Sequence, residues 1–180
     1  MTRLVFPDNT VLINLAYINA IHLIRLRNTQ ATWCASVAQE CRKSSRTPGL
    51  EALEDAPCFL GKPLYPDGAE HSDIRIIRQD MAVPGDPITA HLGEAETIAI
   101  ITRRRINAVF VTDDREATRV ARAHGITVAS TWDILRLAVR LSLITPTDFW
   151  NHCLTLNGKG RGWPPCGRSR AEVDSWLQQT

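Results

Sequence analysis

Apolar and polar residues along this chain follow two periods, one typical of strands and one typical of helices. Short apolar runs at residues 3–6, 108–111 and 126–130 predict buried strands. Between and after these runs, apolar residues recur at helical spacing over four longer stretches. The predicted helices lie at residues 9–26, 91–105, 114–125 and 131–143. Strands that alternate with helices in this way indicate a three-layer α/β fold with a mainly parallel sheet and helices on both faces.

Three further stretches have weaker patterns. Residues 32–44 begin extended and then become helical, with Ser36 as the expected N-terminal cap. Residues 46–72 are rich in proline and glycine and predict a long loop or insertion. Residues 73–79 alternate between apolar and polar positions, which predicts an exposed strand.

Length and composition favour one main domain. The chain has 180 residues, of which 44% are hydrophobic, so it can bury one sizeable core. We expect that domain over residues 1–156, followed by a basic Gly/Pro/Trp tail over residues 157–180. No apolar run approaches the ~20 residues of a membrane span, and we expect no signal peptide. The five cysteines form no CxxC pair, which favours reduced thiols and a cytoplasmic protein.

Charge is nearly balanced, with 21 basic and 19 acidic residues and a formal net charge of +2. A surface for nucleic acid must therefore come from local clusters of cations. The arginines of residues 102–106 are more simply a solvated helix end. Arg115 differs because it directly follows an acidic pair and could reach a phosphate. The cations around Trp163 suit single-stranded RNA and a partner-docking segment about equally well.

Acidic residues follow two of the predicted strands. Asp8 comes shortly after the first strand, and Asp113 and Asp114 follow the strand at 108–111. The carboxyl ends of parallel strands meet at one edge of a sheet, where ligands bind. A single aspartate at a strand end is most simply a helix cap, but capping by Asp114 leaves Asp113 without a role. Clustered carboxylates are costly unless protonated or neutralised, so the sequence indicates a site for a hard cation such as Mg²⁺.

Four motifs, in order and in register, resemble those of PIN-domain nucleases. VFPDNTVLINL, with Asp8, resembles the strand and aspartate that open this family. SVAQECRKS is similar to the segment that carries a second acid, here Glu40. LGEAETIAI resembles the helix start of a bacterial and archaeal branch with a GE-x-E-A-I motif, the VapC-like ribonuclease toxins. VTDD is similar to the family's T-x-D motif, with Asp114 as the last acid. The resemblance runs from residue 3 to about residue 143.

The resemblance implies a PIN-like α/β/α fold and an endoribonuclease that cleaves single-stranded RNA with Mg²⁺ or Mn²⁺ and a metal-activated water. The implied catalytic residues are Asp8, Glu40, Glu96 and Asp114. The implied metal ligands are Asp8, Glu96, Asp113 and Asp114. Glu40 would complete the site and orient the water, and Thr10 and Thr112 would position a phosphate or a ligand carboxylate.

Two assignments within this site stay open. Glu94 and Glu96 lie on nearly opposite faces of a helix, so only one is expected to face the metal. Glu96 precedes Asp114 by 18 residues, close to the family's separation, which favours Glu96. Glu94 would then be a first-turn acid or a group behind the ligands. Asp113 could replace Asp114 as a ligand or share that role.

The resemblance further implies the toxin of a bacterial type II toxin–antitoxin pair, with RNA as substrate, a cognate antitoxin as partner and a homodimer formed through helices. Two other classes compete with this interpretation. A catalytically silent PIN scaffold would bind RNA or a protein without cleaving it. A receiver-type phosphoacceptor domain would need an acidic pair after its first strand and a later lysine. Here the pair follows a late strand, and no lysine lies between residues 63 and 158.

Overall fold

The computed structural model describes residues 3–26, 29–87 and 89–179. Within them, four strands form one sheet in the order β2-β1-β3-β4, and all neighbouring strands are parallel. The strands are β1 (Arg3–Pro7), β2 (Thr29–Ala31), β3 (Ala108–Val111) and β4 (Thr127–Ala129). The predicted α/β fold with a mainly parallel sheet is confirmed.

Both faces of the central strands are buried, because successive side chains enter two separate cores. Val5 and Val111 pack into one core, and Phe6 and Phe110 pack into the other. In the parallel register of β1 and β3, Phe6 lies opposite Phe110. This period of two is the geometry of a strand, and burial on both faces explains why these runs are almost entirely apolar.

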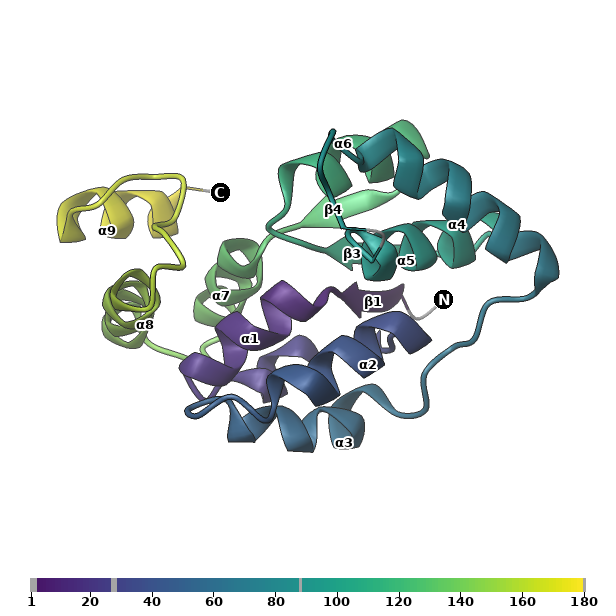
Figure 1. Ribbon diagram of the computed structural model, residues 1–180. Coiled ribbons are helices and arrows are strands. Elements are labelled where there is room, and N and C mark those ends of the chain that lie inside the picture. Colours follow the sequence, from purple (N-terminus) through teal and green to yellow (C-terminus); the bar gives the residue numbers. More distant parts are fainter. Residues whose placement is uncertain (1–2, 27–28, 88, 180) are drawn as a thin grey trace.

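Helices form a layer on each side of the sheet (Figure 1). One layer contains α1 (Asn9–Tyr17), α2 (Ala35–Ser44), α3 (Ala56–Leu60) and α7 (Thr131–Arg140), with the 3-10 helices η1 (Ile21–Ile24) and η2 (Glu51–Asp55). The other layer contains α4 (Gly68–Met81), α5 (Leu92–Arg103) and α6 (Arg115–Ala123). This arrangement confirms the expected three layers.

The predicted strand at residues 73–79 is wrong, because this stretch belongs to α4. Ile74, Ile77 and Met81 are buried at helical spacing. Ile76, which an alternating strand would place beside Ile74, is 68% exposed. The alternation of apolar and polar letters therefore hid a helical stripe.

The predicted loop at residues 46–72 is also partly wrong. It contains η2, α3 and the beginning of α4. Leu53, Ala56 and Leu60 from the two short helices are buried in the core beside α1 and α2. Proline is compatible with these helices because Pro57 lies in the first turn of α3, where a backbone N–H has no helical partner.

The C-terminal part of the chain packs as a lobe beside α7 (Figure 1). It consists of α8 (Pro146–Gly158) and α9 (Arg170–Gln178), and residue 180 lies outside the described residues. Val173 of α9 is fully buried. The ring of Phe149 lies 6.4 Å from that of Trp132 and 6.0 Å from that of Trp176. Much of the expected tail thus shares its core with the preceding helices.

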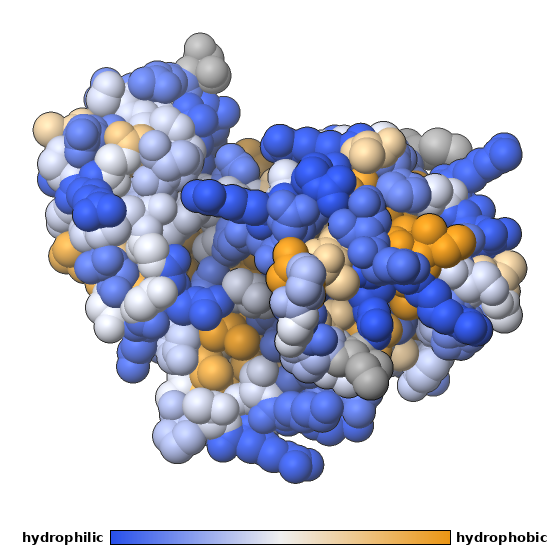
Figure 2. Space-filling model, turned by 45° about the horizontal axis from the view of Figure 1, so that its top comes forward, coloured by the Kyte–Doolittle hydropathy of each residue, from blue (hydrophilic) through white to orange (hydrophobic). Residues whose placement is uncertain are grey.

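The surface is largely hydrophilic on the face that Figure 2 shows, with small separate apolar patches. A notch separates the C-terminal lobe from the body that contains the sheet. In the part of the chain that the structure describes, no helix is both long and apolar enough to span a membrane.

Candidate functional site

The carboxyl ends of the two central strands bring acidic residues together. β1 runs directly into Asp8, whose backbone N–H donates to the carbonyl of Val111 at 2.9 Å. β3 ends at Val111 and runs into Thr112, Asp113 and Asp114. Because β1 and β3 are neighbours in register, Asp8 and the Asp113–Asp114 pair lie at the same edge of the sheet.

Asp8 is a buried carboxylate, only 2% exposed, and both of its oxygens accept hydrogen bonds. Oδ1 accepts the backbone N–H of Val11 at 2.7 Å and so caps α1. Oδ2 accepts the hydroxyl of Thr112 at 2.5 Å. Burial raises the pKa of Asp8 to about 8 against these two hydrogen bonds, and the charges of Glu94 and Asp113 add to the rise. Without a cation, Asp8 therefore holds a proton near neutral pH.

The adjacent aspartates divide two roles between them. Asp114 caps α6, since its Oδ1 accepts the backbone N–H of Ala117 at 2.7 Å. Asp113 accepts the side-chain amide of Asn14 at 2.8 Å, and the backbone N–H and hydroxyl of Thr131 at 2.9 and 2.5 Å. Asp113 therefore has a structural role that the sequence does not predict, because it joins α1 to α7.

Helices α2 and α5 approach closely at Gly93, where they bring Glu40 to the same region. A Cβ atom at Gly93 would lie 2.9 Å from Cγ2 of Val37 and 3.2 Å from Oε2 of Glu40. Burial raises the pKa of Glu40 to about 7, the charge of Glu94 contributes to the rise, and Lys43 opposes it. Glu40 can thus gain or lose a proton near neutral pH.

Glu96 is held by α2. It is 4% exposed, and its carboxylate accepts both the backbone N–H of Ser36, at 3.3 Å, and the hydroxyl of Ser36. The prediction that Ser36 caps α2 is wrong, because Cys34 occupies the cap position. The hydroxyl of Ser36 instead joins α2 to α5 through Glu96.

Glu94 is surrounded by the other acids. Burial raises its pKa, with the charge of Asp114 adding to the rise and His91 opposing it. The charge of Glu94 in turn raises the pKa of Asp8 and of Glu40. Glu94 therefore interacts with acids after β1, in α2 and after β3. Glu96 is bound to Ser36, and its charge acts on Glu40 as well.

Residues 4–155 match a family model described as a PIN domain. The chain belongs to the PIN-domain family. PIN domains are in general nucleases, and this membership excludes the receiver-type alternative. Comparison with curated proteins and with solved structures gave no match.

The acids of this PIN domain have the right chemistry to bind a divalent cation, but they are not arranged around a common point. Carboxylate oxygens are the ligands that Mg²⁺ prefers. A cation would offset both the burial and the repulsion that raise the pKa of Asp8, Glu40 and Glu94. Yet across residues 3–26, 29–87 and 89–179, no group of three or more His, Cys, Asp or Glu side chains is placed to hold a metal ion. The acidic side chains would have to move closer to one another to complete a metal site.

Three other predicted residues lie at or beside the acids of the PIN domain. Thr112 donates to Asp8 and accepts the backbone N–H of Asp114 at 3.1 Å, so its hydroxyl links the two strand ends. Thr10 is half-buried in the first turn of α1. Arg115 is exposed at the first position of α6, directly after Asp114.

Two arginines at the end of α5 form ion pairs with another helix, whereas the sequence predicts a solvated helix end. Nε of Arg103 lies 2.6 Å from Asp73, and Nε of Arg104 lies 2.7 Å from the buried Glu70. Both acids belong to α4, so these ion pairs join the two helices. Arg103 and Arg104 therefore have a structural role.

Sequence reasoning missed Asn14. This residue is 4% exposed on α1, and its Oδ1 accepts Nε of Arg161 from the C-terminal lobe at 2.6 Å. Asn14 thus connects that lobe to Asp113 and the edge of the sheet. A polar residue within the apolar stretch VLINLAY was the available signal, because a buried amide needs hydrogen-bond partners.

Proposed function

We propose that this PIN domain is an endoribonuclease that cleaves single-stranded RNA with Mg²⁺ or Mn²⁺. The observation that carries the proposal is that the acids following β1 and β3 lie at one edge of the sheet, with the pKa raised for Asp8 and for Glu40 and Glu94 of α2 and α5. A bound cation would supply an activated water and stabilise the charge that develops on the phosphate. The family supports nuclease chemistry in general.

Within this proposal, Asp8, Glu94 and Asp114 face the cation. The charges of Glu94 and Glu96 both raise the pKa of Glu40, but only that of Glu94 also acts on Asp8. Glu94 is therefore preferred, since the carboxylate of Glu96 is already bound to Ser36. Asp113 is preferred as a positioning residue, because Asn14 and Thr131 already bind its carboxylate, although it stays a candidate ligand.

Two further side chains have roles that their positions support. Glu40, with its pKa near 7, suits the acceptance of a proton from the attacking water. Arg115 is exposed beside Asp114 at the start of α6, where its guanidinium and the helix dipole both favour a phosphate. Thr112 would keep the carboxylate of Asp8 in orientation.

We also propose that the protein is a cytoplasmic toxin of a bacterial type II toxin–antitoxin pair, in the VapC-like branch, with an antitoxin protein as partner. The sequence LGEAETIAI supports the branch, and five free cysteines support a reducing compartment. Exposed leucines at the end of α7 and on α8 support a homodimer formed through helices. Leu137, Leu141, Leu143 and Leu154 are exposed by 41, 37, 53 and 47%.

Cleavage of a labelled single-stranded RNA in Mn²⁺ tests the nuclease proposal. The wild type should cleave the RNA and should stop when EDTA removes the cation. Asp8→Asn should lower the rate by about 100-fold or more, because it removes a charge that would stabilise the reacting centre. The exposed Asp55→Asn is the matched control and should cleave at the wild-type rate. Equal rates for Asp8→Asn and the wild type would contradict the proposed site.

A catalytically silent PIN scaffold is the second candidate. The observation that favours it is that the described acids include no assembled group of three metal-ligating side chains. A silent scaffold predicts that the wild type binds RNA in Mg²⁺ and in Mn²⁺ but leaves it intact. Cleavage that EDTA abolishes would exclude the silent scaffold.

A further inference from the structure

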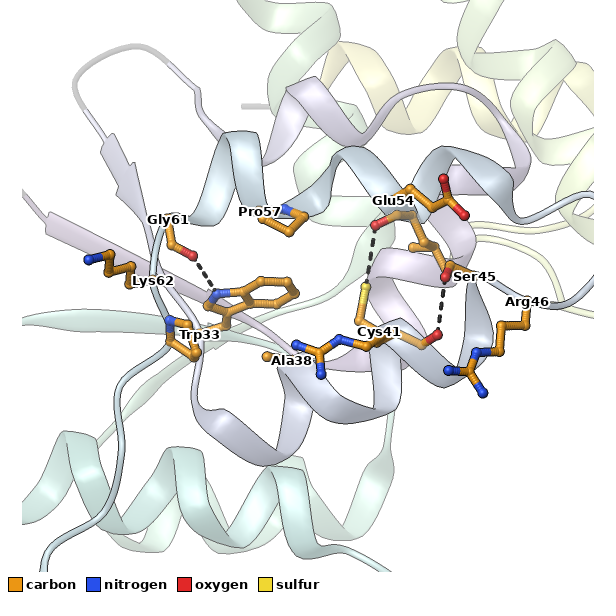
Figure 3. A pocket seen from close by; sticks show the side chains of 12 residues that line it. Trp33, Ala38, Cys41, Ser45, Arg46, Glu54, Pro57, Gly61 and Lys62 are labelled. Carbon is orange, nitrogen blue, oxygen red and sulfur yellow. Dashed lines mark hydrogen bonds between the residues drawn. The ribbon is translucent and has the colours of Figure 1, made fainter.

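A pocket lies between α2, η2, α3 and residues 61–63 (Figure 3). Its volume is about 650 Å³. Pockets that bind small organic molecules commonly have volumes of ~300–1,000 Å³, so this hollow is large enough for one.

The floor of the pocket is apolar and contains a fixed indole ring. Nε1 of Trp33 donates to the carbonyl of Gly61 at 2.9 Å, which sets the plane of the ring (Figure 3). Ala38, Cys41 and Leu53 also line the pocket, and each is less than a tenth exposed. Trp33 is 3% exposed, so only a small part of the fixed ring is open at the bottom of the pocket. Pro57 and Pro63 also line the pocket and add accessible apolar surface.

The rim of the pocket is positively charged. Arg42, Arg46 and Lys62 line it together with a single acid, Glu54, which leaves a net charge of +2 from three cations and one anion. All four residues are exposed. None of the ion pairs found in the described ranges uses any of these three cations. The rim therefore favours an anionic group on a molecule bound below it.

The pocket and the acidic site lie on different faces of α2. Ala38 and Arg42 are four residues apart and face the pocket, whereas Ser36 and Glu40 are four residues apart and face α5. The two pairs are offset by two residues, which turns them to nearly opposite sides of a helix. A molecule in the pocket would thus lie away from the proposed RNA-cleaving residues.

We propose that this pocket binds a small amphipathic organic anion. Its apolar body would lie against Pro57 and the small exposed part of Trp33, and its carboxylate, sulfonate or phosphate would lie among Arg42, Arg46 and Lys62. The apolar floor stabilises the body by removing it from water, and the charged rim selects an anion over a neutral molecule. The proposal does not depend on the nuclease reaction.

Fluorescence titration of the full chain with 8-anilinonaphthalene-1-sulfonate tests the chemistry of the ligand. The wild type should bind this probe saturably and should bind N-phenyl-1-naphthylamine, which lacks the sulfonate, at least tenfold more weakly. The double variant Arg42→Glu/Lys62→Glu should lower the affinity for the sulfonate at least tenfold and leave the affinity for the neutral probe within twofold. Both residues are exposed, and circular dichroism checks that the variant folds.

The matched control is Arg75→Glu/Arg122→Glu, which makes the same change of charge on exposed residues of α4 and α6. It should bind the sulfonate as the wild type does. In ¹H–¹⁵N spectra, the indole N–H resonance of Trp33 should shift on addition of the sulfonate. Absence of saturable binding, equal loss of affinity in both double variants, or an unmoved Trp33 resonance would overturn the proposal.

Discussion

At the scale of single residues, Glu94 and Glu96 show how two acids on one helix acquire different chemistry. The carboxylate of Glu96 accepts two hydrogen bonds from Ser36. Burial and neighbouring acids raise the pKa of Glu94. Counting residues back from Asp114 selects Glu96. The spacing does not reveal that Ser36, on another helix, binds its carboxylate. The sequence thus predicted the acidic edge but could not assign a role to each acid.

We expect Glu94→Gln to weaken Mn²⁺ binding about 10–100-fold, as the loss of a ligand or its support does in other metal sites. Glu96→Gln should weaken it less and should lower the melting temperature more, because Ser36 loses its carboxylate partner. Isothermal titration calorimetry and thermal unfolding measure the two effects. The opposite order in Mn²⁺ affinity would return the ligand role to Glu96.

The raised pKa values of Asp8 and Glu40 predict how stability depends on pH without a divalent cation. Their folded values, about 8 and about 7, exceed the value of ~4 expected in the unfolded chain. Between pH ~4 and ~8 the folded protein therefore holds protons on Asp8 and Glu40 that the unfolded chain has released. The free energy of unfolding thus falls as the pH rises through this range. In EDTA, the melting temperature of Asp8→Asn should rise relative to that of the wild type as the pH increases from 5 to 8. A constant difference between the two proteins would contradict the raised pKa of Asp8.

At the scale of elements, strands β1, β3 and β4 and the acidic edge were predicted, but β2 and α4 were not. β1 and β3 are short apolar runs, because a strand that is buried on both faces has apolar residues at nearly every position. In α4, the isoleucines suggest a strand when they are read two apart. Asp67 and Glu70 form a capping box with both hydrogen bonds at 2.8 Å, and that signal was present in the sequence DGAE.

The close contact of α2 and α5 predicts that Gly93→Ala is harmful. The added Cβ would lie 2.9 Å from Cγ2 of Val37 and 3.2 Å from Oε2 of Glu40, so these side chains or the two helices must shift. We expect a loss of stability of about 1–3 kcal/mol, together with reduced RNA cleavage. Gly68→Ala is the matched control, because no atom lies within 4 Å of its Cβ position, and urea unfolding should find it neutral or slightly stabilising. Equal stability of both variants would show that α2 and α5 do not approach as described.

At the scale of the whole molecule, the C-terminal lobe is attached to both the core and the site. Arg161 donates to Asn14, and the guanidinium of Arg136 on α7 lies 4.4 Å from the centre of the Trp176 ring. Trp163 lies 5.8 Å from the ring of Trp150, so it packs within the lobe. Composition alone suggested a basic tail. A run of glycine, proline and arginine does not reveal which helices its tryptophans contact.

The buried Val173 tests whether this lobe unfolds with the sheet. Val173→Ala should lower the stability of the whole chain by about 2 kcal/mol and should preserve a single unfolding transition. The exposed Gln178→Ala, on the same helix, should leave the stability unchanged. Two separate transitions by circular dichroism would instead indicate that the lobe folds independently.

The central claim is that acids from four elements form one divalent-cation site at the carboxyl edge of the sheet. Anomalous scattering from crystals grown with Mn²⁺ tests this claim most directly. We expect a peak about 2.1 Å from carboxylate oxygens of Asp8 and Glu94, the spacing typical of small hard cations, and no peak in Asp8→Asn. A wild-type peak elsewhere, or no peak at saturating Mn²⁺, would contradict the account.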